Sequence, residues 1–174
     1  VLSAIALAVV VILILILTDT QKNQAVQALK PITSSIEGMG GKKICSNGDN
    51  GYSLSNRVPW YDVYYRVGNS TSLTDEVKAF ARAEGYELSD DVDFINSLKG
   101  IDNADGSYTH PYGDEKFNDQ SNYLKASHDG SSLEVVINRE ASVALYCTGG
   151  NYGKAESTGN DAIVRLHISL PATQ

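Results

Sequence analysis

An uninterrupted apolar run at the amino end constrains this chain more than any other feature. Residues Val1 to Leu17 read VLSAIALAVVVILILIL, and Ser3 is the only polar side chain among them. As a helix rising 1.5 Å per residue, the run would span about 26 Å, close to the hydrocarbon thickness of a bilayer. Apolar side chains on every side of such a helix require lipid or protein around it. The sequence therefore predicts a transmembrane or filament-core helix over residues 1–17.

A cleaved secretory signal is the competing interpretation of this run. Such a signal has a basic segment before the apolar run and a small-residue cleavage site after it. The residues that follow Leu17 read TDTQK and offer no such site. The chain starts at Val1 instead of Met, which fits either truncation or proteolytic processing. We therefore favour an anchor that is retained in the protein.

Residues 18–41 are predicted to form an amphipathic helical stalk that ends in a glycine hinge. Apolar side chains recur there at helical spacing: Ala25, Val26, Leu29, Ile32 and Ile36. Pro31 should kink or end the helix near Lys30, because proline removes a backbone donor. Three glycines between residues 38 and 41 then stop the helix.

Residues 42–174 are predicted to form one extracytoplasmic domain. Alternating residues indicate strands at 42–46, 58–67, 122–127, 131–138, 141–148 and 162–170. Asp129-Gly130 predicts a hairpin turn, and the Gly-rich residues 148–159 read as a loop. Helices should begin near Ser72, in a capping box, and near Ser89. The expected fold class is α+β: a long N-terminal hydrophobic helix, then a two-layer domain of antiparallel sheet with helices on one face.

Charge and cysteine content limit the environment of this domain. The chain has 14 basic and 21 acidic residues, a net charge of −7, so it should repel nucleic acid. Cys45 and Cys147 are its only cysteines, and neither belongs to a CxxC motif. Outside the cytoplasm they should form a disulfide, and closing a loop of roughly 100 residues contributes about 4–5 kcal/mol. Two buried free thiols in a cytosolic domain are the alternative.

No group of residues in the domain predicts an active site or a cofactor site. The histidines His110, His128 and His167 share no helical or strand spacing, so a metal site would need separate loops to converge. An enzyme would need the long loop Ile101–Gln120 to bring them into a cleft, and the chain has no G-x-S-x-G elbow. We expect no catalytic, cofactor or metal residues.

Acidic residues in that long loop leave one metal alternative open. A calcium site outside the EF-hand pattern would use Asp102, Asp105, Asp114 and Glu115. The loop lacks the D-x-[DN]-x-[DN]-G spacing, so we interpret these carboxylates as parts of solvated turns.

Aromatic residues and one sequon are the remaining candidate sites. The chain has ten tyrosines, and Trp60, Tyr61, Tyr64 and Tyr65 gather on one predicted strand. Tyr61 and Tyr65 should share one face, with Trp60 and Tyr64 on the other. Either core packing or an aromatic contact surface explains this set. Asn69 begins an Asn-Ser-Thr sequon for N-glycosylation in a predicted surface turn.

The layout of residues 1–37 resembles that of type IV pilin-like proteins. An apolar helix runs into an amphipathic half, and a β-rich head with a disulfide follows. In filaments of that family the apolar helix leaves the membrane and packs in the fibre core. The resemblance therefore implies a filament subunit that contacts its copies through residues 1–37. Ile5 stands where the family's acidic residue is expected, and VLSAI replaces the usual aromatic start followed by Thr-Leu-Ile-Glu.

We therefore expect a non-enzymatic, single-pass, membrane-anchored structural or binding protein whose domain lies at the cell surface. Its partners would be the bilayer or neighbouring copies through residues 1–37, and an extracellular protein or glycan. A pilin-like subunit of an extracellular filament is the alternative, and a cell-surface hydrolase is a further one.

Overall fold

A computed structural model describes most of the carboxy-terminal part of the chain. The described residues are 24–49, 58–68, 70–89, 101–102, 108–109, 122–139, 142–148 and 152–171. The apolar run at residues 1–17 and the sequon at Asn69 lie outside these ranges, so their predictions remain predictions.

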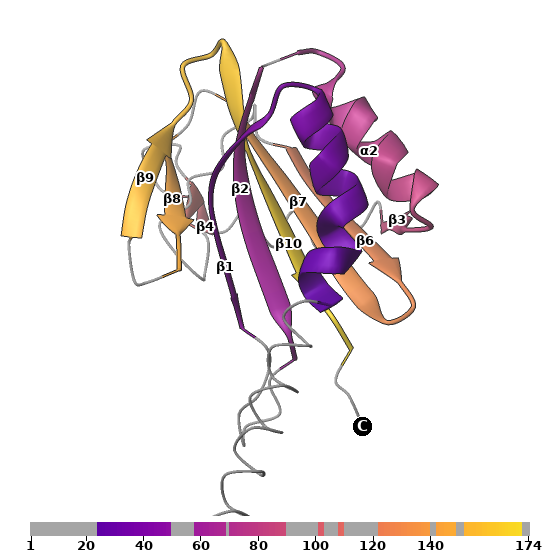
Figure 1. The fold of residues 1–174 in the computed structure, drawn as a ribbon. Coiled ribbons are helices and arrows are strands. Elements are labelled where there is room, and N and C mark those ends of the chain that lie inside the picture. Colours follow the sequence, from indigo (N-terminus) through magenta and orange to yellow (C-terminus); the bar gives the residue numbers. More distant parts are fainter. Residues whose placement is uncertain are drawn as a thin grey trace, which may run out of the picture.

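A six-stranded sheet forms the centre of the molecule (Figure 1). In spatial order its strands are β1 (Lys42–Asp49), β2 (Trp60–Gly68), β10 (Asp161–Ser169), β7 (Ser131–Arg139), β6 (Asn122–His128) and β3 (Glu87–Ser89). Every neighbouring pair is antiparallel. The last strand in the sequence, β10, therefore lies between β2 and β7, and residues far apart in the chain become neighbours there.

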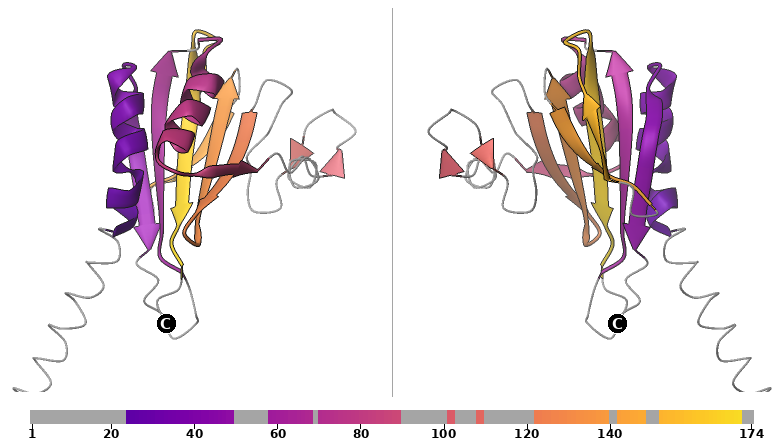
Figure 2. Two further views of the ribbon diagram at one scale, coloured as in Figure 1. Left: turned by 90° about the vertical axis from the view of Figure 1, so that its right-hand side faces the viewer. Right: turned by 90° about the vertical axis from the view of Figure 1, so that its left-hand side faces the viewer.

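Two helices pack against one face of this sheet. One is described over residues 24–38 and the other is α2 (Leu73–Ala83). Figure 2 shows the helix of residues 24–38, in indigo, standing beside the sheet. Its apolar stripe is completely buried in the core: Ala25, Leu29, Ile32 and Ile36. These side chains meet alternate residues of β2, β7 and β10, because successive strand residues point to opposite faces.

The predicted fold class is wrong. It named a long hydrophobic helix as the leading element, whereas the leading element of the described residues is the helix of residues 24–38, followed by mostly antiparallel sheet and a second helix. No helix in the described part of the chain has the length and apolarity to cross a membrane. The helix of residues 24–38 has one apolar stripe, and the sheet buries it. Ser89 is the last residue of strand β3, and the helix predicted to begin near it lies outside the described residues.

The helix of residues 24–38 ends in a hydrogen-bonded turn. Gly41 donates its amide to the carbonyl of Ile36 at 2.9 Å, and Gly40, at φ +84°, donates to Glu37 at 2.9 Å. This pattern is a Schellman cap, in which a residue with positive φ ends the helix. The helix also continues through Pro31, where an end or a kink was expected. The connection to β1 therefore has defined hydrogen bonds.

Two short hairpins complete the described chain. β8 (Ser142–Tyr146) pairs with β9 (Tyr152–Glu156), and β4 (Ile101–Asp102) pairs with β5 (Tyr108–Thr109). β9 lies where a loop was expected. The β6–β7 turn is confirmed, since Asp129 and Gly130 have φ values of 47° and 77°. Both residues thus adopt the left-handed conformation that a type I′ hairpin turn requires.

The predicted disulfide between Cys45 and Cys147 is confirmed. It joins β1 to the residue that follows β8, with 5.7 Å between the two Cα atoms. Thr148 strengthens the link, because its amide and its hydroxyl both donate to the carbonyl of Ser46. A small apolar cluster lies beside it on the sheet face away from the helices: Tyr64, Val143, Leu145, Ala155 and Ile163.

Candidate functional site

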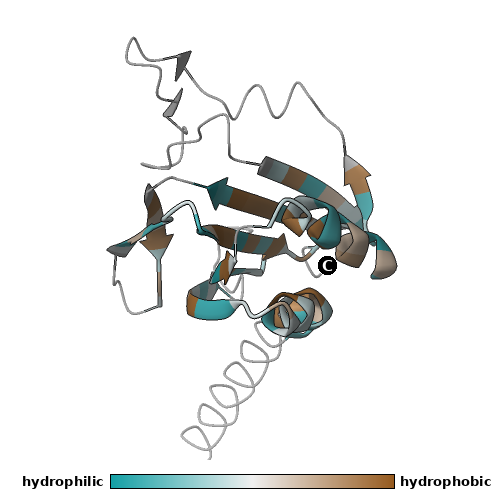
Figure 3. Cartoon of the chain, turned by 90° about the horizontal axis from the view of Figure 1, so that it is seen from above, coloured by the Kyte–Doolittle hydropathy of each residue, from teal (hydrophilic) through white to brown (hydrophobic). Residues whose placement is uncertain are grey.

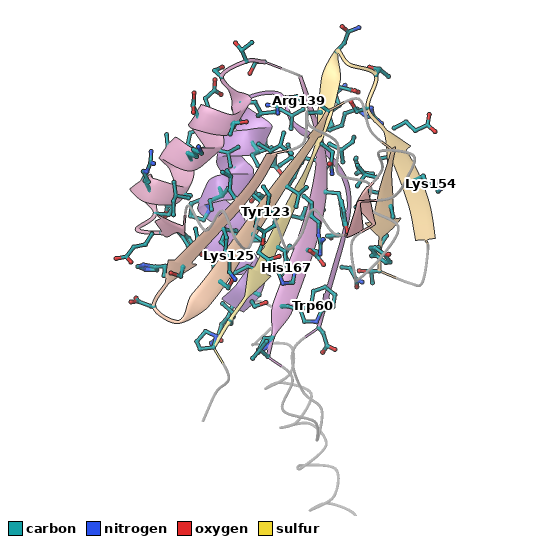
Figure 4. All side chains as sticks on the ribbon, turned by 180° about the vertical axis from the view of Figure 1, so that it is seen from behind. Trp60, Tyr123, Lys125, Arg139, Lys154 and His167 are labelled. Carbon is teal, nitrogen blue, oxygen red and sulfur yellow. A yellow bond between two sulfur atoms is a disulfide. The ribbon has the colours of Figure 1, made fainter. Side chains whose placement is uncertain are left out.

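Polar side chains of β2 and β10 gather on the sheet face away from the helices. Figure 3 shows the alternation of hydrophilic and hydrophobic residues along the strands that separates the two faces. The antiparallel register sets His167 opposite Asp62 and Ser169 opposite Trp60, and Arg165 precedes His167 by two residues. Figure 4 views this face, with Trp60 and His167 close together. We call these five residues the polar cluster.

Asp62 is the centre of the polar cluster. It is 5% exposed, and its Oδ1 accepts hydrogen bonds from Arg165 Nε and His167 Nδ1, each at 3.0 Å. Burial by itself would raise the pKa of the Asp62 carboxyl. The hydrogen bond from His167 and the charge of Arg165 outweigh burial, and the pKa is lowered below its ordinary value. Asp62 is therefore a buried carboxylate that stays ionised at neutral pH.

This carboxylate decides the tautomer of His167. An ionised carboxylate only accepts hydrogen bonds, so the imidazole proton lies on Nδ1. In the neutral ring Nε2 is then an acceptor. Ser169 Oγ lies 2.9 Å from Nε2, so its hydroxyl donates to the ring when the ring is neutral. The side chains thus form a directed chain of hydrogen bonds, from Ser169 through His167 to Asp62.

An aromatic ring limits the movement of this imidazole. Trp60 stacks on His167, with ring centroids 6.0 Å apart and an angle of 29° between the planes. Trp60 also lies directly opposite Ser169 in the register. The imidazole therefore has hydrogen bonds at both nitrogens and an indole beside one face.

Charged residues continue from the polar cluster across the sheet. On β7, Glu134 lies opposite His167, and on β6, Lys125 lies opposite Glu134. Burial raises the pKa of the nearby Tyr123 hydroxyl, and the negative charge of Glu134 raises it further. Acidic and basic groups therefore alternate over four strands, which lowers repulsion on a partly buried face.

The aromatic residues predicted as an interface have two different surroundings. Tyr61, Tyr64 and Tyr65 are buried, at 8%, 0% and 2% exposure, and they pack within the chain. Tyr65 donates its hydroxyl to Glu37 Oε1 at 2.9 Å, which ties β2 to the end of the first helix. Burial and this carboxylate raise the pKa of Tyr65. Trp60 is half-buried and belongs to the polar cluster.

The histidines and acidic residues considered for metal binding are spread over the chain. His128 lies at the β6–β7 turn, with its ring 5.5 Å from that of Tyr86, and His167 lies on β10. Asp102 belongs to β4, and His110, Asp105, Asp114 and Glu115 lie outside the described residues. Among the described residues, no three His, Cys, Asp or Glu side chains are grouped to hold a metal ion.

Sequence reasoning missed Asp62, Arg165 and Ser169 as site residues. Asp62 and His167 are 105 residues apart, so no local motif joins them. The available signal was strand alternation, which sets Trp60 and Asp62 on one side of β2 and Arg165, His167 and Ser169 on one side of β10. Only the pairing of β2 with β10 brings the two sets together.

Comparison of the chain with protein-family models, curated proteins and solved structures finds no match.

Proposed function

We propose that this protein is a structural or binding protein whose apolar amino-terminal run attaches a disulfide-bonded domain to the outer side of a membrane. The observation that carries the proposal is the Cys45–Cys147 disulfide, which uses both cysteines of the chain. Disulfides persist in oxidising compartments and are rare in the cytosol. The run from Val1 to Leu17 supplies an apolar segment ahead of this domain.

The packing of residues 24–38 supports a structural role. Four apolar side chains of this helix are fully buried, and its last turn accepts hydrogen bonds from Tyr65 and Gly41. The helix of residues 24–38 is therefore built into the core. A load or a displacement applied to the amino-terminal segment would reach the sheet through packed side chains.

A pilin-like filament subunit is a second candidate. The docking of an amphipathic helix on an antiparallel sheet favours it, because the apolar run would then extend from a folded head. In this arrangement residues 1–37 contact neighbouring copies in place of lipid. Both candidates place the domain in an oxidising aqueous space.

Fractionation of the full chain tests the proposal. We expect wild-type protein in the membrane fraction or in sedimentable fibres, and Val10→Lys/Leu13→Lys in the soluble fraction. Each lysine at the centre of an inserted segment costs about 2.5–3.5 kcal/mol. The matched control is Val58→Lys, which adds a lysine at an apolar side chain that is already 37% exposed and should not change fractionation.

Negative-stain microscopy of sheared material separates the two candidates, since only the filament subunit gives fibres. A freely soluble wild-type monomer with two alkylatable thiols would contradict both.

A further inference from the structure

We propose that Ser169 is an activated nucleophile for carboxylic esters, with His167 as its general base and Asp62 as the residue that positions the base. Ser169 Oγ lies 2.9 Å from His167 Nε2, and His167 Nδ1 lies 3.0 Å from Asp62 Oδ1. A nucleophile in contact with a base, and a base held by a third group, is the arrangement that activates serine in acyl transfer. This activity goes beyond the proposed function and does not rest on it.

Arg165 keeps the chain of hydrogen bonds in the required direction. Its Nε binds the same carboxylate oxygen as His167, at 3.0 Å, which favours the charged form of Asp62. The charged carboxylate holds the proton of His167 on Nδ1, so the lone pair of Nε2 faces the hydroxyl of Ser169. An imidazole in the other tautomer would offer Ser169 a donor and would not accept its proton.

The strand that carries both reacting groups is held on its two sides. β10 pairs with β2 along its full length and with β7 from Ala162 to Ser169. The imidazole also stacks on Trp60, so its rotation is restricted. Ser169 is the last residue of β10 and is half-buried, so it is held in the strand and is partly open to solvent. Such fixed geometry reduces the entropy cost of reaching a reactive arrangement.

The chemical step is an acyl transfer to Ser169. Its Oγ attacks the ester carbonyl carbon, and the hydroxyl proton moves to His167 Nε2. The bond from the carbonyl carbon to the leaving oxygen then breaks, and the proton passes from Nε2 to the departing alcohol. The products are the free alcohol and an ester between the acyl group and Ser169. Asp62 stays ionised throughout and stabilises the imidazolium.

Phosphonylation of the full chain in detergent gives the first test. An alkyl fluorophosphonate should form an adduct at Ser169, located by peptide mass spectrometry. The adduct should fall at least about tenfold in His167→Asn, as expected on loss of a general base. The matched control is Ser132→Ala, which removes the serine directly opposite Ser169 on β7 and should keep the adduct. A folded wild-type chain without an adduct at Ser169 would overturn the proposal.

Cysteine substitution gives a test that needs no bound substrate. Alkylation by iodoacetamide is followed against pH in Ser169→Cys and, as the matched control, in Ser132→Cys. We expect a midpoint below pH 7 for the first thiol and near pH 8.5 for the second, because an adjacent base stabilises the thiolate. Adding Asp62→Asn to Ser169→Cys should move the midpoint upward, which a purely structural role of Asp62 would not do. Equal midpoints in the two single variants would overturn the proposal.

Discussion

Replacing Leu29 by alanine should destabilise the domain by about 3–4 kcal/mol. Leu29 lies on the helix of residues 24–38 and is 0% exposed, in the same core as β2, β7 and β10. Full burial of a leucine side chain contributes about 1.5–3 kcal/mol, and the cavity left by alanine raises the total cost to about 2–5 kcal/mol. A helix that stood apart from the domain as a stalk would lose almost nothing.

Urea denaturation of the full chain in detergent measures this effect. The only tryptophan, Trp60, stacks on His167 in the polar cluster, so its fluorescence reports on the sheet. With a slope of about 2 kcal/mol per molar urea, a loss of 3 kcal/mol lowers the midpoint by about 1.5 M. The slope itself should not change.

The matched control is Gln27→Ala, an exposed position two residues away on the same helix. It should stay within about 0.5 kcal/mol of wild type, as surface substitutions usually do. If the midpoint of Leu29→Ala coincides with that of Gln27→Ala, the helix does not belong to the cooperative core. A load on the amino-terminal segment would then not reach the sheet through this helix.

Three further perturbations follow from the described contacts. Cys45→Ala/Cys147→Ala should lower stability by about 4–5 kcal/mol in the same urea assay, because the bond closes a loop across 102 positions. The pKa of Asp62 is lower in the folded state than its unfolded value of about 3.9, so its contribution to stability is fully present above about pH 3.9 and is lost as the pH falls through the folded pKa. In Asp62→Asn this loss of stability at acid pH should be absent from thermal melts. Gly41→Ala should cost roughly 1–3 kcal/mol, since its Cβ would lie 2.6 Å from a backbone oxygen, whereas Gly38→Ala meets nothing within 4 Å and should be tolerated in the same melts.

Sequence patterns predicted the strands well where the signal was local. Successive side chains of a strand point to opposite faces of the sheet. Along β2, Tyr61 and Tyr65 therefore lie on the face that the helices cover, and Trp60 and Tyr64 lie on the other face. The Asp129-Gly130 turn follows from the same kind of local preference. The strand β9 was missed, because four of its five residues, Gly, Lys, Ala and Glu, have little β-propensity, and only the pairing with β8 holds the segment extended.

The helix of residues 24–38 shows how tertiary packing overrides a local preference. Pro31 predicted an end or a kink near Lys30, since proline inside a helix costs about 3 kcal/mol or more. Ile32 and Ile36 lie just beyond it and are completely buried on the sheet. Their burial contributes about 1.5–3 kcal/mol each, which offsets the cost and keeps the helix continuous.

By itself, the sequence determined the local patterns: an apolar run, an amphipathic helix, alternating strands and a hairpin turn. These depend on side chains within a few residues of each other. The tertiary structure alone decided that the amphipathic stripe is buried on the sheet, and that Asp62 meets His167 and Ser169. Those contacts come from the register between β2 and β10, which the whole core selects and no short segment encodes.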